Sequence, residues 1–159
     1  MIPKLKKVLY VSDIEDGSRP AFRMAVSLAK QYAADIVFLH VITPIPNSVV
    51  LTLESTLSAD AYSQLQKEGM GNLKAVIDER IGAFCISELE SLDSQPYIES
   101  LVLEGIVHEK IVEVAHKIEA NMIVMGTRTH SATKQFFMGS VANKVMRNSD
   151  VPVLVVPLS

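Results

Sequence analysis

Five short apolar runs, separated by longer segments, are the feature of this sequence that most restricts its fold. The runs cover residues 8–11, 36–42, 98–103, 122–125 and 151–156. They show no regular polar alternation, which is typical of strands buried on both faces of a parallel sheet. Strands that alternate with helices predict right-handed crossovers and helices on both faces. We therefore expect an α/β fold with a five-stranded parallel sheet in the order 3-2-1-4-5, as a single domain over residues 1–159.

The segments between the runs carry apolar residues at spacings of three and four, which predicts amphipathic helices. The first helix is expected to begin after Ser18, whose side chain would cap it. Two later helices are expected at about residues 107–120 and 139–150. Residues 48–91 allow either one long helix that bends near Gly69 or two helices, because glycine weakens a helix interior by about 1 kcal/mol. The resulting strand and helix order is flavodoxin-like.

The ends of the predicted strands locate a candidate ligand site. Open parallel sheets bind ligands beyond the C-terminal ends of their strands, at the point where the strand order reverses. Asp13, Val41 and Gly126 stand at three of these ends. Gly126 is expected to let the chain turn with no Cβ beside a ligand, and Gly139-Ser140 offers free N–H groups at a helix start. This pattern is typical of a phosphate-binding site. In the alternative interpretation, Gly126 only turns the chain and Gly139 only caps a helix.

Charge and composition argue against several classes of function. A net charge of -3 gives no basic face for nucleic acid. The first apolar run has four residues, too short for a signal peptide or a membrane span. A single cysteine, Cys85, fits a reducing compartment, so a cytoplasmic location is expected. His40 is expected to be a satisfied interior histidine, and no catalytic residue and no metal site can be assembled from the remaining side chains.

Asp13 also suggests a different class of protein, a response-regulator receiver domain that is phosphorylated on an aspartate. In that interpretation Thr127 would be the switch residue, and a lysine would follow the fifth strand. Residues 153–159 contain no lysine, and Glu104 stands where the receiver aspartate would be expected. We therefore set the receiver interpretation aside.

The stretch from Gly126 to Ser140 resembles a motif of the universal stress protein family. Nucleotide-binding members carry G-x-x-G, nine residues, and then G-[ST]. Here Gly126 and Gly139-Ser140 match at full spacing, while Thr129 replaces the second glycine. The resemblance extends over most of the chain through the segments KKVLYVSD, LHV and VPVLVVP.

The resemblance implies an adenine nucleotide, with ATP expected first and AMP or ADP as alternatives, and with Mg²⁺ held mainly by phosphate oxygens. Asp13 would contact the ribose or adenine side, and the backbone of Val41 would pair with the adenine edge. Gly139 and Ser140 would donate to the phosphates. The residues that the resemblance assigns to the nucleotide are Val11, Ser12, Asp13, Val41, Met125, Gly126, Arg128, Gly139, Ser140 and Val141.

The resemblance leaves three functions open. The first is a nucleotide-binding sensor or regulatory module in a stress response, with little hydrolysis. The second is a nucleotide-free adaptor that acts through protein contacts, and the third is a slow ATPase. A homodimer through the strand at residues 151–156 is implied under the first two, because this run forms an apolar sheet edge. Thr129 distinguishes the nucleotide-binding function from the nucleotide-free adaptor. A β-branched residue is disfavoured where a glycine adopts a positive φ, so it would weaken nucleotide binding.

Overall fold

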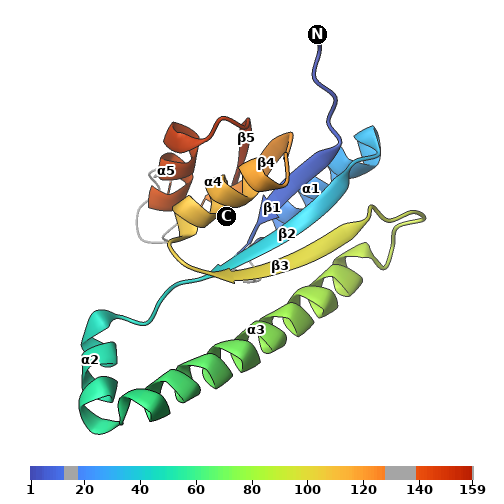
Figure 1. Ribbon diagram of the computed structural model, residues 1–159. Coiled ribbons are helices and arrows are strands. Elements are labelled where there is room, and N and C mark those ends of the chain that lie inside the picture. The colour runs from blue at the N-terminus through green and yellow to red at the C-terminus, as the bar shows by residue number, and fades with distance from the viewer. Residues whose placement is uncertain (13–17, 128–138, 159) are drawn as a thin grey trace.

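The chain forms a five-stranded parallel sheet in the order β3-β2-β1-β4-β5, as predicted (Figure 1). The computed structural model describes residues 1–12, 18–127 and 139–158. The strands are β1 (Lys7–Val11), β2 (Asp35–Ile42), β3 (Ile98–Glu104), β4 (Met122–Thr127) and β5 (Val153–Pro157). The helices are α1 (Arg19–Tyr32), α2 (Asn47–Thr56), α3 (Ala59–Leu89), α4 (Val107–Lys117) and α5 (Ser140–Asn148).

Helices cover both faces of the sheet, because alternate residues of each strand point to opposite sides. On the first face, strand residues such as Tyr10 and Phe38 pack with α1 and α3. On the second face, residues such as Leu9 and Ile123 pack with α4 and α5. β1, at the centre, contributes three fully buried side chains to these two cores, Val8, Leu9 and Tyr10.

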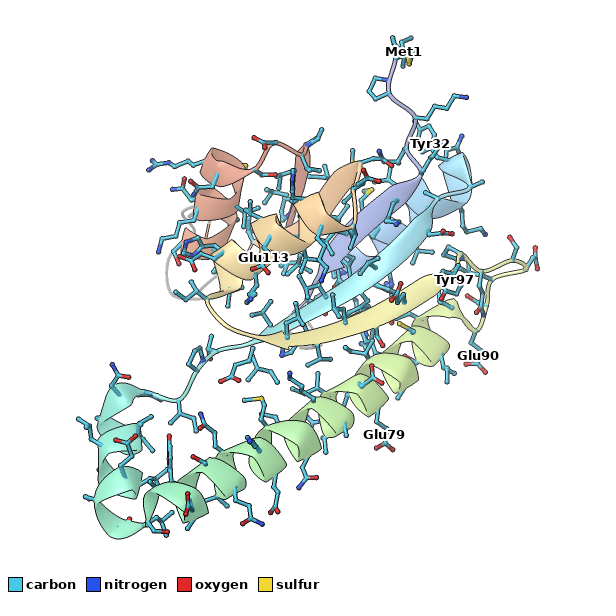
Figure 2. All side chains as sticks on the ribbon, viewed as in Figure 1. Met1, Tyr32, Glu79, Glu90, Tyr97 and Glu113 are labelled. Atoms are coloured by element: carbon cyan, nitrogen blue, oxygen red, sulfur yellow. The ribbon has the colours of Figure 1, made fainter. Side chains whose placement is uncertain are left out.

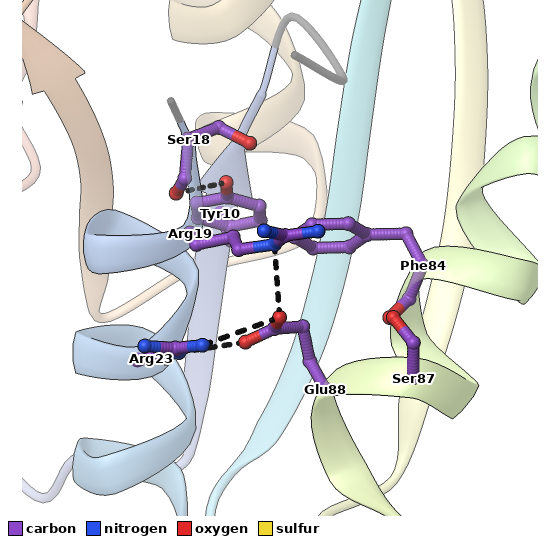
Figure 3. A network of polar contacts seen from close by, with 7 residues as sticks. All are labelled: Tyr10, Ser18, Arg19, Arg23, Phe84, Ser87 and Glu88. Carbon is purple, nitrogen blue, oxygen red and sulfur yellow. Dashed lines mark hydrogen bonds and ion pairs between the residues drawn. The ribbon is translucent and has the colours of Figure 1, made fainter. Parts of the chain in front are cut away.

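An aromatic cluster fixes α1 and α3 on the first face. The rings of Tyr10, Phe22, Phe38 and Phe84 lie with centroids 4.8–6.1 Å apart in tilted or edge-to-face arrangements. The Tyr10 hydroxyl donates to the Ser18 carbonyl over 3.3 Å (Figure 3). Ser18 occupies the N-cap position of α1, but its side chain makes no capping hydrogen bond, so that part of the prediction was wrong.

A charged network joins the same two helices (Figure 3). The Glu88 side chain, 8% exposed, lies 3.1 Å from Arg19 Nε and 2.7 Å from Arg23 Nε. Hydrogen bonding to Glu88 raises the pKa of the Arg23 guanidinium above its usual value. The two arginines are one helical turn apart on α1, so a single carboxylate bridges both. This network orients the second half of α3 against the sheet.

The segment at residues 48–91 forms two helices, and the break lies earlier than the glycines suggested. α2 ends at Thr56, and α3 begins after Ser58, whose hydroxyl accepts from the Ala61 N–H over 3.2 Å. α3 then continues through Gly69. α2 has no buried residue, and the buried residues of α3 all lie from Ile77 onward. α2 and the first half of α3 therefore extend beyond the sheet, with their side chains spread around the ribbon (Figures 1 and 2).

Several predicted boundaries differ from the structure, and three of the differences have a visible physical reason. β4 continues through Gly126 to Thr127, because β5 supplies hydrogen-bonding partners to its end. β5 begins at Val153, not at residue 151, because Ser149 Oγ bonds both the N–H and the carbonyl of Val151 in a turn. α4 ends at Lys117, where the chain leaves the helix through Glu119 at a φ of 54°. None of the helices in the described ranges combines the length and the apolar character of a membrane span.

Candidate functional site

β1 stops before its two neighbours at the C-terminal side of the sheet. Its last pairs are Val11 with Leu39 of β2 and Val11 with Met125 of β4. β2 continues to Ile42 along β3, and β4 continues to Thr127 along β5. The switch-point edge, defined here as Val11, Ser12, Val41, Met125 and Gly126, is therefore a place where β2 and β4 extend past the strand between them. This is where an open parallel sheet presents backbone groups to a ligand.

The backbone of Val41 is the clearest feature of this edge. In the β1–β2 ladder the Asp35 N–H donates to the Lys6 carbonyl, and the Ser12 N–H donates to the Leu39 carbonyl. Odd-numbered residues of β2 thus direct their N–H and carbonyl groups toward β1. Val41 is the next odd-numbered residue, and β1 has ended there. Within the described ranges, the Val41 N–H and carbonyl have no backbone partner on this side.

Ser12, the last described residue before Asp13, is held at both of its backbone polar groups. Its N–H donates to the Leu39 carbonyl over 3.1 Å, and its carbonyl lies 2.7 Å from Nδ1 of His40. Because a carbonyl can only accept, His40 carries its proton on Nδ1. His40 is hydrogen-bonded, as expected, but it is half-buried rather than fully interior.

Gly126 has a different structural reason from the predicted one. It lies within β4, paired with Val156, so the chain does not turn there. A Cβ added to Gly126 would meet the Leu158 side chain, with Cγ at 2.7 Å and Cδ2 at 3.0 Å. The space next to this glycine is filled by the chain's own C-terminal segment. The lack of a side chain at Gly126 therefore permits close packing of Leu158.

The start of α5 presents backbone donors at the same edge. α5 connects β4 to β5, so its first turn lies at the C-terminal end of the sheet. Gly139 is the N-cap residue, no described side chain caps the helix, and the first turn has no acidic residue. The first N–H groups of a helix have no partner within the helix, and the helix dipole adds partial positive charge. Ser140 is exposed, while Val141 is half-buried against the second core.

The structure therefore places eight of the ten predicted site residues at one edge of the sheet. Met125, Val41 and Ser12 are no more than 8% exposed, so they would contact a ligand mainly through backbone atoms. Asp13 and Arg128 lie outside the described residues, as does Thr129. Among the described residues, no three side chains of the metal-ligating kinds gather in one place.

Two other features of the molecule lie away from this edge. A hollow of about 500 Å³ lies between α1 and α3, where Phe22, Val26 and Leu89 are among its apolar lining residues. It extends along α1 to Lys30, toward the N-terminal side of the sheet. Cys85 of α3 is half-buried, and its burial raises the pKa of the thiol to about 11. The thiol is therefore protonated at neutral pH and a poor nucleophile.

Residues 4–157 match the universal stress protein family. The chain belongs to this family. Universal stress protein MJ0531 of Methanocaldococcus jannaschii is 32% identical over 154 residues, which span 95% of this chain and 81% of that protein.

Two universal stress proteins of known structure share the fold of this chain. One, in complex with cAMP, has a TM-score of 0.60 and 22% identity, and the match covers 99% of this chain and all of that one. The other, from Archaeoglobus fulgidus in complex with dAMP, has a TM-score of 0.56 and 19% identity, with 98% of each chain covered. At these identities the likeness concerns the fold.

One residue at the edge of this universal stress protein was not among the predicted site residues. His40 was interpreted only as an interior histidine, although its hydrogen bond holds the carbonyl of the residue that precedes Asp13. The sequence did contain a signal, because His40 immediately precedes Val41 in a strand that was expected to end at the ligand site. Neighbouring strand residues lie on opposite faces, so this signal did not identify the partner of the imidazole.

Proposed function

We propose that this universal stress protein binds an adenine nucleotide at the switch-point edge, as a sensor or regulatory module. The observation that carries the proposal is the early end of β1, beyond which the Val41 N–H and carbonyl have no backbone partner on the β1 side among the described residues. Adenine offers an acceptor at N1 beside a donor amine at N6, so one strand residue can pair with both. The proteins solved with cAMP and with dAMP also support it, because these two ligands share the adenine base.

The first turn of α5 would take the phosphates. Its N–H groups and the exposed Ser140 hydroxyl supply donors, and the dipole favours negative charge. ATP is the expected ligand, with AMP or ADP as alternatives, and phosphate oxygens would hold Mg²⁺. The proposal gives Asp13 to the ribose or adenine side and Arg128 to the phosphate loop, as the family pattern implies. We expect hydrolysis to be slow at most, because no described residue of this edge is a clear water-activating base. We also expect the protein to be cytoplasmic.

Calorimetry with purified protein and Mg-ATP tests the proposal. We expect a dissociation constant in the micromolar range. Ser140→Ala should weaken binding by about ten- to a hundredfold, because a hydrogen bond to a charged group contributes about 1.5–3 kcal/mol. The matched control is Ser63→Ala, an exposed serine on the protruding half of α3, which should bind like the unchanged protein. Millimolar or absent affinity in the unchanged protein would exclude nucleotide binding and leave the adaptor function.

The proposal also includes a homodimer through β5, which the nucleotide-free adaptor function would share. β5 is an edge of the sheet, its residues Val153 to Val156 are all half-buried, and it carries no charged residue. The opposite edge, β3, carries the charges of Glu99 and Glu104. Charges on an edge strand discourage pairing with another chain, so β5 is the edge better suited to it.

Light scattering should therefore give about twice the 17.4 kDa of one chain. The Ile123 N–H donates to the Pro152 carbonyl, so even-numbered residues of β5 face β4 and the Val155 N–H faces outward. Val155→Pro removes that outward donor and no hydrogen bond to β4. We expect this variant to have the mass of a single chain. A monomeric unchanged protein, or a Val155→Pro variant that remains dimeric, would argue against dimerisation through this edge.

A further inference from the structure

The imidazole of His40 donates to a carbonyl that would accept a backbone hydrogen bond in a regular β1–β2 ladder. The donors alternate along the ladder, and among the described residues the Ser12 N–H bond to the Leu39 carbonyl is the last one. In a regular parallel pair the next bond would run from the Val41 N–H to the Ser12 carbonyl. That bond is absent from the described residues. The Ser12 carbonyl instead accepts from His40 Nδ1 over 2.7 Å.

We propose that His40 is a positioning residue for adenine, because it holds the Ser12 carbonyl and thereby leaves the Val41 N–H for the base. The inference rests on the proposed nucleotide site and adds the reason why Val41 is available there. A buried N–H seeks a partner, and Val41 is only 8% exposed. If the imidazole did not hold the Ser12 carbonyl, that carbonyl would be the nearest acceptor in the ladder. The His40 side chain therefore determines whether the Val41 N–H can donate to a base.

This arrangement has a consequence for the choice of base. The Val41 N–H can donate to N1 of adenine, and its carbonyl can accept from the N6 amine. Guanine presents the opposite pattern, a donor at N1 and an acceptor at O6. An N–H that remained paired with Ser12 would remove the donor that adenine needs. His40 is thus expected to affect the preference for adenine over guanine as well as the affinity.

Two substitutions at His40 separate this effect from simple packing. His40→Leu removes the donor and keeps comparable bulk, so the Ser12 carbonyl loses its bond to the imidazole and can accept from the Val41 N–H. His40→Asn keeps an N–H donor at the position of Nδ1. We expect His40→Leu to bind ATP about five to ten times more weakly, with a similar fall in the ratio of ATP to GTP affinity. His40→Asn should remain within about twofold of the unchanged protein, as should the control His116→Leu, an exposed histidine on α4.

Amide hydrogen exchange of the ligand-free protein tests the same claim without a nucleotide. In the unchanged protein the Val41 amide should exchange faster than the Leu39 amide, which the ladder protects. In His40→Leu the Val41 amide should become at least tenfold slower, and in His40→Asn it should not. An unchanged Val41 exchange rate in His40→Leu would overturn the inference. So would an unchanged ratio of ATP to GTP affinity in that variant.

The two proposals fail in different ways. If the unchanged protein does not bind ATP, the proposed function is wrong, and the exchange of the Val41 amide still decides whether His40 controls this backbone group. If the unchanged protein binds ATP and His40→Leu binds it equally well, the proposed function stands and the inference about His40 is wrong. Thermal unfolding of each variant shows that the measurements are made on folded protein.

Discussion

Replacing Gly126 with alanine is expected to lower the free energy of unfolding by about 1–3 kcal/mol, as for other overpacked sites. The added methyl group would lie 2.7 Å from Leu158 Cγ, a separation that Cβ atoms in proteins essentially never show, and 3.0 Å from Cδ2. Leu158 must then leave the first core, against which it packs, or β4 must shift from β5. Urea denaturation measures the loss. The matched control is Gly82→Ala in α3, where a Cβ meets no atom within 4 Å, and it should be neutral or stabilising.

A second background separates the two interpretations of Gly126. In a Leu158→Ala protein the obstructing atoms are absent. Adding Gly126→Ala should then lower the free energy of unfolding by less than about 0.5 kcal/mol, which is the size of deviation seen between sites that do not interact. If the glycine serves packing only, the double variant should bind ATP as Leu158→Ala does. If a ligand also needs the space, the double variant should fold and yet bind poorly. If Gly126→Ala lowers the free energy of unfolding as much in the Leu158→Ala background as in the unchanged protein, Leu158 is not the obstruction.

The sheet and its order were predictable from the sequence because each strand is a short apolar run and each crossover has helical periodicity. The residues of such runs are buried whatever their exact partners, so the pattern is local. Strand ends were less predictable, because they depend on neighbours far along the chain. β4 extends to Thr127 only because β5 pairs with it as far as Pro157. Gly126 was misread for the same reason, since Leu158 lies 32 residues later.

The candidate site was predictable where backbone position matters and less so where side chains meet across the sheet. Val41 and Ser140 were placed correctly at the edge, because both follow from the topology of a parallel sheet. The contact of His40 with the Ser12 carbonyl joins residues 28 positions apart and requires the register of β1 on β2. The Glu88 network likewise joins residues 65 positions apart. No pattern within one segment reports such pairs.

The break between α2 and α3 is marked in the sequence by a helix cap and not by the glycines. Gly69 and Gly71 drew attention because glycine lowers helix propensity, yet an added Cβ at either meets no atom within 4 Å, and the helix continues. The actual start of α3 is a serine cap, Ser58, with an acidic residue, Asp60, in the first turn. A cap satisfies backbone donors that a helix start leaves free, so it determines where a helix begins. The propensity penalty of a glycine only weakens a helix that packing can retain.

Replacing Thr129 with glycine is expected to tighten ATP binding by about five- to a hundredfold. The family pattern has a glycine at this position, and this chain has a β-branched residue. Where a glycine of a phosphate loop adopts a backbone conformation that other residues avoid, a β-branched residue there costs about 1–3 kcal/mol. That energy would come from the free energy of nucleotide binding. Calorimetry of both proteins with Mg-ATP measures the difference directly.

Thr133→Gly is the matched control for that experiment, because it makes the same change four residues later in the same segment. Added chain flexibility would affect both variants, and it should weaken binding, because a freer loop loses more entropy when it closes on a ligand. A conformational requirement at position 129 would strengthen binding only in Thr129→Gly. If both variants bind ATP no better than the unchanged protein, the threonine does not limit the site. If the unchanged protein fails to bind and Thr129→Gly binds, Thr129 is what separates an adaptor from a nucleotide sensor in this chain.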